Sequence, residues 1–494
     1  MKYQRSCRPW VTCDRRKTIR KLKRLLLCLM WSSMIILFIQ DTVFSDTSDY
    51  LVGIFGLPLG DFEILKETGL NSILLRAFEV EKAKGLSLNK FYFPGVTTRK
   101  LNMGLNYDEL DNAIKIFKAA GDAYNYYIGD DLTCRQRDRI NDIRNRLGIR
   151  KGTVGVKRSV RCYEDLDVFV YYYPLMRTQI SLREMLKTQV SQRNKQKSAK
   201  GNNFYLFIQA HPQLWYRKVI ETAGAGEDAL LYPDGQVVRM TVYYAVATGC
   251  NGFFLYDWRG LSEKESKERL YAAAQTILET RPLYQSVSYA QGVEFFQKSG
   301  DIYGTVVSGS SYDIIFAFTG DVRTLYHPST KPLQVTMKDL INVSKYKSVY
   351  IYSPAGSIPA GDKVEVPQDK ALILIAFKDK ADIANFTLDA NKVNLYLQIL
   401  QTRAEILARN MEKKGITVPS FKVGSDEPKG KIMSLLNYID NLNEIKRASW
   451  IKKSGNLPMD GDELNNRYWK SVRGAAFLDK SDLKGQVFNF YYDH

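Results

Sequence analysis

Short apolar segments alternate with helix-like segments along residues 50–280, and this alternation restricts the fold more than any other feature of the chain. Eight segments have the apolar character of buried parallel strands: 51–55, 71–76, 86–93, 123–128, 153–156, 167–172, 204–209 and 252–256. We expect a helix after each strand, because repeated βα units produce such a pattern. Residues 107–120, for example, carry Leu110, Ala113, Ile114 and Phe117 at helical spacing.

Eight βα units predict an α/β protein with a closed (β/α)8 barrel, the TIM barrel, over residues 46–284, since such barrels span about 250 residues. An open, doubly wound sheet is the alternative. No Gly-x-Gly-x-x-Gly sequence follows the first strand, which excludes the usual dinucleotide-binding form of that sheet. The basic segment 191–203 is predicted to be a solvated loop.

The pattern changes after residue 284. Segments 291–298, 302–308, 312–318, 332–337, 348–353 and 370–377 are short, rich in β-branched and aromatic residues, and separated by turn signals. They predict an antiparallel β-sandwich over 285–380. In the region 381–494, Val393, Leu397, Leu400, Ala404, Leu407 and Met411 form one helical stripe, and residues 432–442 form a second. A C-terminal helical hairpin is expected, with the stripes packed against neighbours rather than in a coiled coil.

The N-terminus resembles an export signal. Residues 1–45 hold ten basic and two acidic residues, and the 15-residue run 25–39 is apolar apart from two serines. This run matches a signal-peptide core and is short for a membrane span of about 20 residues. A cleaved signal peptide or an uncleaved signal anchor is therefore predicted for 1–45, so the protein would be extracytoplasmic, either secreted or anchored. The protein would contact a membrane only through that anchor.

The rest of the composition excludes several functions. The chain has 71 Lys+Arg against 53 Asp+Glu, a net charge of +18, which falls to +10 without residues 1–45. No nucleic-acid-binding module is visible. With three His and no Cys-x-x-Cys pair, we expect no metal and no cofactor. Cys134, Cys162 and Cys250 could form one disulfide with a spare thiol, or three buried thiols, which we favour.

In (β/α)8 barrels the loops after the strands build the active site. The polar and aromatic residues in these positions include Arg76, Asp130, Asp131, Tyr173, Gln209, His211, Asp257, Trp258 and Arg259. Carboxylates together with Tyr, Trp and Arg suit sugars, whose C–H faces stack on rings and whose hydroxyls need polar partners. We therefore expect an oligo- or polysaccharide ligand. Asp130 could instead cap the next helix, and His211 could be an ordinary loop residue.

Four motifs in order resemble those of glycosidase-related barrels. Tyr127-Ile128-Gly129-Asp130-Asp131 resembles their strand-four acidic pair, and Asp167 to Pro174 resembles their strand six. Phe207 to His211 resembles strand seven, and Tyr232 to Phe253 resembles the helix and strand that end the barrel. A β-sandwich after the barrel is also usual in that group. The likeness covers roughly residues 50–380 and identifies no single family.

The resemblance implies glycoside hydrolysis by two carboxyl groups, one that donates a proton and one that attacks or activates water. Asp131 takes the place of the acid, and Asp130 would raise its pKa by like-charge repulsion. Asp257 is the candidate base. The chain departs from the pattern where Asp131 replaces Glu, where Leu132 replaces Pro, and where Gln209 replaces a nucleophilic Glu. A non-catalytic carbohydrate-binding or structural cell-surface protein is the alternative.

Overall fold

The computed structural model describes residues 50–454 except 57–61, 122, 157–159, 173–181, 201, 211–233, 257–262, 299–301, 321–331, 368–369, 380–382, 423 and 425–426. The predicted leader 1–45 lies outside these residues, as does the end of the predicted C-terminal region. No helix in the described ranges is both long enough and apolar enough to span a membrane.

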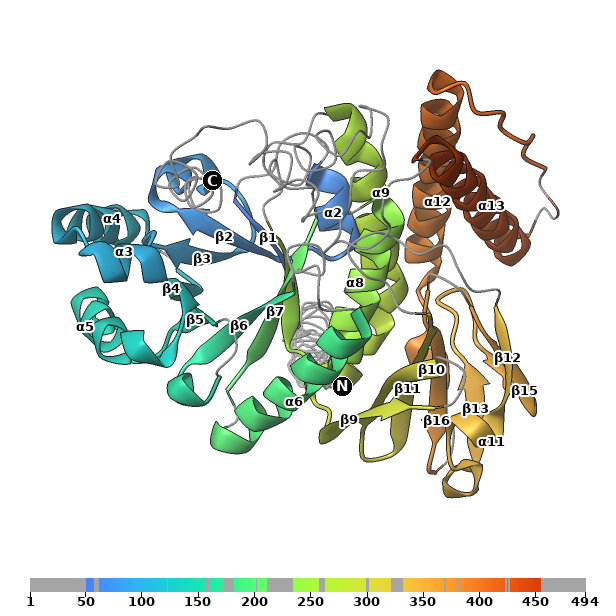
Figure 1. The fold of residues 1–494 in the computed structure, drawn as a ribbon, viewed down its shortest axis with the longest axis horizontal. Coiled ribbons are helices and arrows are strands. Elements are labelled where there is room, and N and C mark those ends of the chain that lie inside the picture. Colours follow the sequence, from blue (N-terminus) through green and yellow to red (C-terminus); the bar gives the residue numbers. More distant parts are fainter. Residues whose placement is uncertain are drawn as a thin grey trace, which may run out of the picture. The chain divides into compact units, whose positions relative to one another are not determined.

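Eight parallel strands form a closed barrel in the order β1 to β8 (Figure 1). Their bounds are β1 Leu51–Phe55, β2 Ser72–Arg76, β3 Asn89–Phe93, β4 Asn125–Leu132, β5 Thr153–Val156, β6 Asp167–Tyr172, β7 Phe204–Gln209 and β8 Gly252–Tyr256. The ring closes where Leu51 of β1 pairs with Gly252 of β8. The predicted (β/α)8 barrel is therefore confirmed, and the open-sheet alternative is excluded.

Seven α-helices of the described chain connect the barrel strands or follow them: α2 Phe62–Thr68, α3 Thr98–Met103, α4 Tyr107–Ala120, α5 Arg137–Leu147, α6 Leu182–Lys200, α8 Gly235–Ala247 and α9 Glu263–Thr280. Figure 1 shows α4 and α5 on one side of the barrel and α8 and α9 on another. The expected helix after every strand is wrong for β2, because its connection to β3 holds only the 3-10 helices η1 Ala77–Glu79 and η2 Glu81–Ala83. Between β5 and β6 the described residues form only the 3-10 helix η4 Val160–Tyr163.

The predicted loop over 191–203 is also wrong, because α6 extends to Lys200. Beyond residue 190 the buried face of this helix is polar: Arg193 is 1% exposed and donates to the carbonyl oxygens of Gly249 (3.1 Å) and Ala290 (3.0 Å). Gln196 donates to the carbonyl oxygen of Leu166 at 2.8 Å. The apolar stripe of α6 ends at Val190, and beyond it backbone carbonyls accept the hydrogen bonds of Arg193 and Gln196.

The sandwich consists of a six-stranded antiparallel sheet, β14-β13-β16-β11-β10-β9, and a two-stranded sheet, β12-β15. The strands are β9 Gly292–Gln297, β10 Ile302–Ser308, β11 Tyr312–Thr319, β12 Leu333–Thr336, β13 Ser348–Ile351, β14 Ile358–Pro359, β15 Lys363–Val366 and β16 Leu372–Phe377. One face of the large sheet shares a core with the small sheet, through residues such as Ile315, Val364 and Leu374. The other face joins the barrel core, where Phe318 stacks on Tyr244 of α8 at 4.3 Å.

Helices α12 Ala390–Lys413 and α13 Pro428–Ser454 form the expected C-terminal hairpin and contact each other (Figure 1). Helix α12 also packs on α9 of the barrel. Arg403 of α12 is fully buried there, at 2.6 Å from Oε1 of Gln275 and 3.2 Å from Oε1 of Glu268. Because barrel, sandwich and hairpin share these contacts, the domain limits at residues 284 and 380 stay predictions.

Candidate site at the carboxyl ends of the barrel strands

The strands of a parallel barrel all end on the same face, so the residues that end β2, β4, β7 and β8 share one mouth. Arg76 ends β2, Asp130 and Asp131 lie near the end of β4, and Gln209 ends β7. Of the other predicted site residues, Tyr173, His211, Asp257, Trp258 and Arg259 lie outside the described residues. Asp257 follows directly on Tyr256, the last residue of β8.

Strand β4 is distorted where it reaches the mouth. Tyr127 pairs with Thr153 of β5 and Leu132 pairs with Val156, so β4 advances five residues while β5 advances three. The extra residues are accommodated by two register shifts, which bend the strand and turn its side chains away from a regular alternation. The amide of Asp130 has left the ladder with β5 and donates to the carbonyl oxygen of Val96 at 2.9 Å.

Asp130 is held by two hydrogen bonds at one oxygen. Its Oδ1 accepts the hydroxyl of Tyr127 at 2.5 Å and the amide of Asp131 at 2.9 Å. The alternative role of Asp130 as a helix cap is wrong, because the next helical turn, η3 Cys134–Gln136, starts from Thr133, whose amide donates to the side chain of Gln136. The carboxylate of Asp130 therefore organises its own strand end.

Asp131 has a left-handed backbone. Its φ is 60°, and no other non-glycine residue in the described ranges has a positive φ. Asp tolerates this region better than most residues, yet such a conformation still costs on the order of 1 kcal/mol and persists only where surrounding bonds fix it. The hydroxyl of Thr98 at the start of α3 supplies one such bond, at 2.6 Å from the carbonyl oxygen of Asp131. The half-buried Asp131 is thus held from both its amide and its carbonyl side.

Aromatic rings fill the barrel below the mouth. A separate core cluster inside the barrel has ten buried members, and eight of these are Phe or Tyr. Phe55 of β1 contacts Phe93 at 6.2 Å and Tyr256 at 5.2 Å between ring centroids, and Phe93 contacts Tyr127 at 5.1 Å. The guanidinium of Arg76 lies 5.4 Å from the Phe55 ring centroid. A continuous layer of rings therefore connects Arg76, the Tyr127–Asp130 pair and the residue before Asp257.

Glu79 is a buried carboxyl group that sequence reasoning missed. The structure places it in η1, 2% exposed, with Oε2 accepting the amide of Arg76 at 2.8 Å. The only available signal was its position three residues after the end of a predicted strand. It fixes the backbone of Arg76 at the mouth.

Gln209 is also buried, at 2% exposure, and pairs with Tyr256 of β8. The neutral amide at this position therefore lies beside the strand that leads into Asp257. Groups of three or more His, Cys, Asp and Glu side chains that could hold a metal ion do not occur among the described residues.

A disulfide fastens the loop that follows Asp131. Cys134 is bonded to Cys162, while Cys250 is a buried free thiol, so the favoured expectation of three buried thiols is wrong. The hydroxyl of Tyr163 also donates to the carbonyl oxygen of Thr133, at 2.7 Å. The loops after β4 and β5 are thereby joined beside the acidic pair.

Ion pairs extend this connection. Asp165, after η4, contacts Arg137 and lies 2.7 Å from Arg144, both on α5. Partial burial acts to raise the pKa of Asp165, but the two guanidinium groups outweigh it and lower that pKa. Asp165 is therefore ionised near neutral pH, and its ion pairs reinforce the connection that the Cys134–Cys162 disulfide makes.

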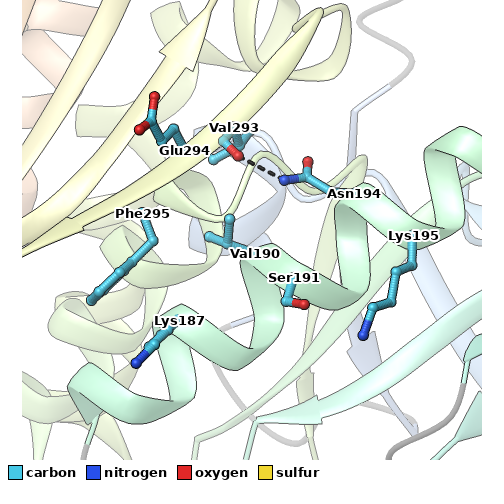
Figure 2. A pocket seen from close by; sticks show the side chains of 8 residues that line it. All are labelled: Lys187, Val190, Ser191, Asn194, Lys195, Val293, Glu294 and Phe295. Carbon is cyan, nitrogen blue, oxygen red and sulfur yellow. Dashed lines mark hydrogen bonds between the residues drawn. The ribbon is translucent and has the colours of Figure 1, made fainter.

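The described chain also has an open pocket of about 620 Å³ elsewhere, between α6 and β9 (Figure 2). Lys187, Val190 and Asn194 line it from α6, and Val293 to Phe295 line it from β9. Asn194 is tied to the carbonyl oxygen of Val293 at 2.7 Å. None of the predicted site residues lines this pocket, so it is separate from the mouth of the barrel.

No protein-family model and no curated protein sequence matches the chain. Solved structures do match. One is a glycoside hydrolase family 5 structure from Bacteroides vulgatus ATCC 8482, with 12% identity, a TM-score of 0.44, and coverage of 69% of this chain and 91% of that chain. A second is a GH27 β-L-arabinopyranosidase from Geobacillus stearothermophilus, with 8% identity, a TM-score of 0.42, and coverage of 68% and 98%.

A third is an α-amylase from H. orenii, with 9% identity, a TM-score of 0.38, and coverage of 67% of this chain and 100% of that chain. Such low identities and TM-scores indicate no particular activity. The fold class, a closed (β/α)8 barrel with an appended β-sandwich, therefore rests on the strand order of this chain itself.

Proposed function

We propose that the chain is an exported, glycoside-hydrolase-like protein that hydrolyses glycosidic bonds with two carboxyl groups. The observation that carries this proposal is Asp131, whose left-handed backbone is fixed at the barrel mouth by Thr98 and by Asp130. Strained, over-determined residues concentrate at functional sites, and the carboxyl ends of barrel strands are where barrel enzymes place their catalytic groups.

In this proposal Asp131 protonates the glycosidic oxygen, and Asp257 activates the attacking water. Strands β4 and β8 are four positions apart in a ring of eight, so their ends lie across the mouth from each other. A separation wide enough for a water molecule favours inversion of the anomeric carbon. Asp130 supports the pair by holding Asp131.

The layer of buried rings supports this chemistry from below. Phe55, Phe93 and Phe207 are at most 3% exposed, so they close the barrel under the mouth and keep water from that side. Charges above such an apolar floor interact more strongly than charges in water. We propose that substrate hydroxyls and ring faces are bound above it by Arg76, Tyr173, Gln209, His211, Trp258 and Arg259.

Export is supported by two features. The segment 1–45 has the composition of a signal peptide or signal anchor. The Cys134–Cys162 disulfide suits an oxidising compartment outside the cytoplasm. Fractionation of cells that express the full chain tests this proposal: recovery with a processed N-terminus outside the cytoplasm, or in the membrane with residues 1–45 retained, supports it, and soluble cytoplasmic protein contradicts it.

The catalytic proposal is tested with the purified protein and a panel of aryl glycosides, oligosaccharides and polysaccharides. Asp131→Asn should abolish hydrolysis of any active substrate, since an amide cannot donate the proton. Asp138→Asn is the matched control, because Asp138 is an exposed carboxylate on the nearby helix α5. An unchanged rate in Asp131→Asn removes Asp131 from the mechanism.

A non-catalytic carbohydrate-binding protein is the second candidate. The specific observation in its favour is Gln209, a buried neutral amide at the end of β7 that cannot act as a nucleophile. Direct binding measurements on the same glycan panel separate the two. Saturable binding with no turnover favours the binding protein, and turnover that depends on Asp131 favours the enzyme.

A further inference from the structure

Tyr127 is one of the rings inside the barrel, and its hydroxyl has a directed partner at the mouth. The side chain is fully buried, and its Oη lies 2.5 Å from Oδ1 of Asp130. Its ring packs edge-on against Phe169 and Phe207, with centroids 5.5 and 5.7 Å away. Phe would serve this packing equally well, so the hydroxyl accounts for Tyr at this position through its bond to Asp130.

The neighbouring strand leaves space for this bond. A Cβ atom added to Gly155 of β5 would lie 1.8 Å from the Tyr127 hydroxyl oxygen and 2.6 Å from Oδ1 of Asp130. Real atoms do not approach so closely, and both obstructing atoms are the two ends of the hydrogen bond. Gly155 has no positive φ, so the requirement for glycine here is space and not backbone conformation.

The same oxygen of Asp130 accepts the amide of Asp131, whose φ is 60°. Rotation of the Asp130 carboxylate would therefore break the bond that restrains Asp131 on its amide side. The Tyr127 hydroxyl opposes that rotation, because it fixes the carboxylate from inside the barrel.

We infer that Tyr127, in the space left by Gly155, is a positioning residue that fixes the Asp130 carboxylate and thereby the backbone of Asp131. The inference rests on the proposed function for its catalytic consequence. It also assigns Asp130 the role of an anchor, distinct from the proton transfer proposed for Asp131.

Tyr127→Phe removes only the hydroxyl, and Gly155→Ala inserts a methyl group into the bond. Each should lower kcat by roughly 10- to 100-fold while KM changes less than about twofold, because misplacement of a reacting group acts on the chemical step. Tyr92→Phe is the control, since it removes another partly buried Tyr hydrogen bond, from its hydroxyl to the carbonyl oxygen of Gly121 (3.1 Å), away from the mouth. Equal kcat in Tyr127→Phe and Tyr92→Phe overturns the inference.

Amide hydrogen exchange at Asp131 supplies a readout that needs no activity. The amide should exchange roughly 10-fold faster in Tyr127→Phe and in Gly155→Ala than in the wild type, and at the wild-type rate in Tyr92→Phe. Unchanged exchange in both site variants overturns the inference, whatever the activity. If the Asp131 amide exchanges faster in the two variants but the wild type hydrolyses no glycoside, the proposed function is contradicted and the positioning role is supported. If one of the two variants fails to fold, the other decides.

Discussion

The Cys134–Cys162 disulfide should contribute several kcal/mol to the free energy of unfolding. It connects residues 28 positions apart, and the loss of loop entropy in the unfolded chain corresponds to about 3.6 kcal/mol at 25 °C. With a urea m-value of about 3 kcal/mol/M, its removal should lower the unfolding midpoint by roughly 1 M. The Tyr163–Thr133 bond and the Arg144–Asp165 ion pair remain, so the loop should loosen without unfolding the barrel.

The assay is urea unfolding of the wild type and of Cys134→Ser/Cys162→Ser, each with and without a phosphine reductant. The wild-type midpoint should fall on reduction to that of the double variant, and the double variant should not respond. Cys250→Ala is the control, because this buried free thiol lies outside the loop, and it should respond to reductant as the wild type does. Equal wild-type midpoints with and without reductant would refute the reasoning.

Two further predictions concern the C-terminal hairpin and its contact with α9. Arg403→Met should lower the free energy of unfolding by about 3–5 kcal/mol, because it leaves the Glu268 carboxylate buried without this guanidinium partner. Arg409→Met, at an exposed position of the same helix, should change that free energy by less than about 0.5 kcal/mol. Equal denaturation midpoints for the two variants would contradict this prediction. Burial alone would raise the pKa of Glu279, but Arg239 at 3.0 Å and hydroxyl donors lower it below the ordinary value of 4.5. The stability that this carboxylate contributes is therefore complete above pH 4.5 and is lost as the pH falls through the lower, folded pKa. The difference in unfolding free energy between the wild type and Glu279→Gln should shrink over that acid range, and a difference that stays constant would exclude this linkage.

The sequence was sufficient for the barrel because buried parallel strands are continuous apolar runs that need no knowledge of their neighbours. Helix α4 occurs at the predicted residues, 107–120, because three local signals agree: its residues have an apolar face, Asn106 caps its first turn, and Gly121, with φ 66°, ends it. The end of helix α6, from residue 191 to 200, was missed because its buried face is made of Arg193, Gln196 and other polar residues, and the carbonyl partners of these two come from distant segments. Hydrophobic periodicity has no signal for such a face.

At the candidate site, the sequence could supply the residue types but not their restraints. The acidic pair was recognisable from its place after a strand, whereas the left-handed φ of Asp131 depends on Thr98, which lies 33 residues earlier in the chain. The disulfide was not the favoured prediction, because the loops after β4 and β5 become neighbours only when the barrel forms.

The central claim is that Asp131 and Asp257 act together across one mouth. The most direct measurement is the distance between their carboxyl groups in a crystal structure of the protein with a bound oligosaccharide. We predict roughly 6.5–9.5 Å, with the glycosidic oxygen against Asp131 and a water molecule against Asp257. A separation beyond about 12 Å, too wide for the two groups to act on one bond, would contradict the proposed mechanism.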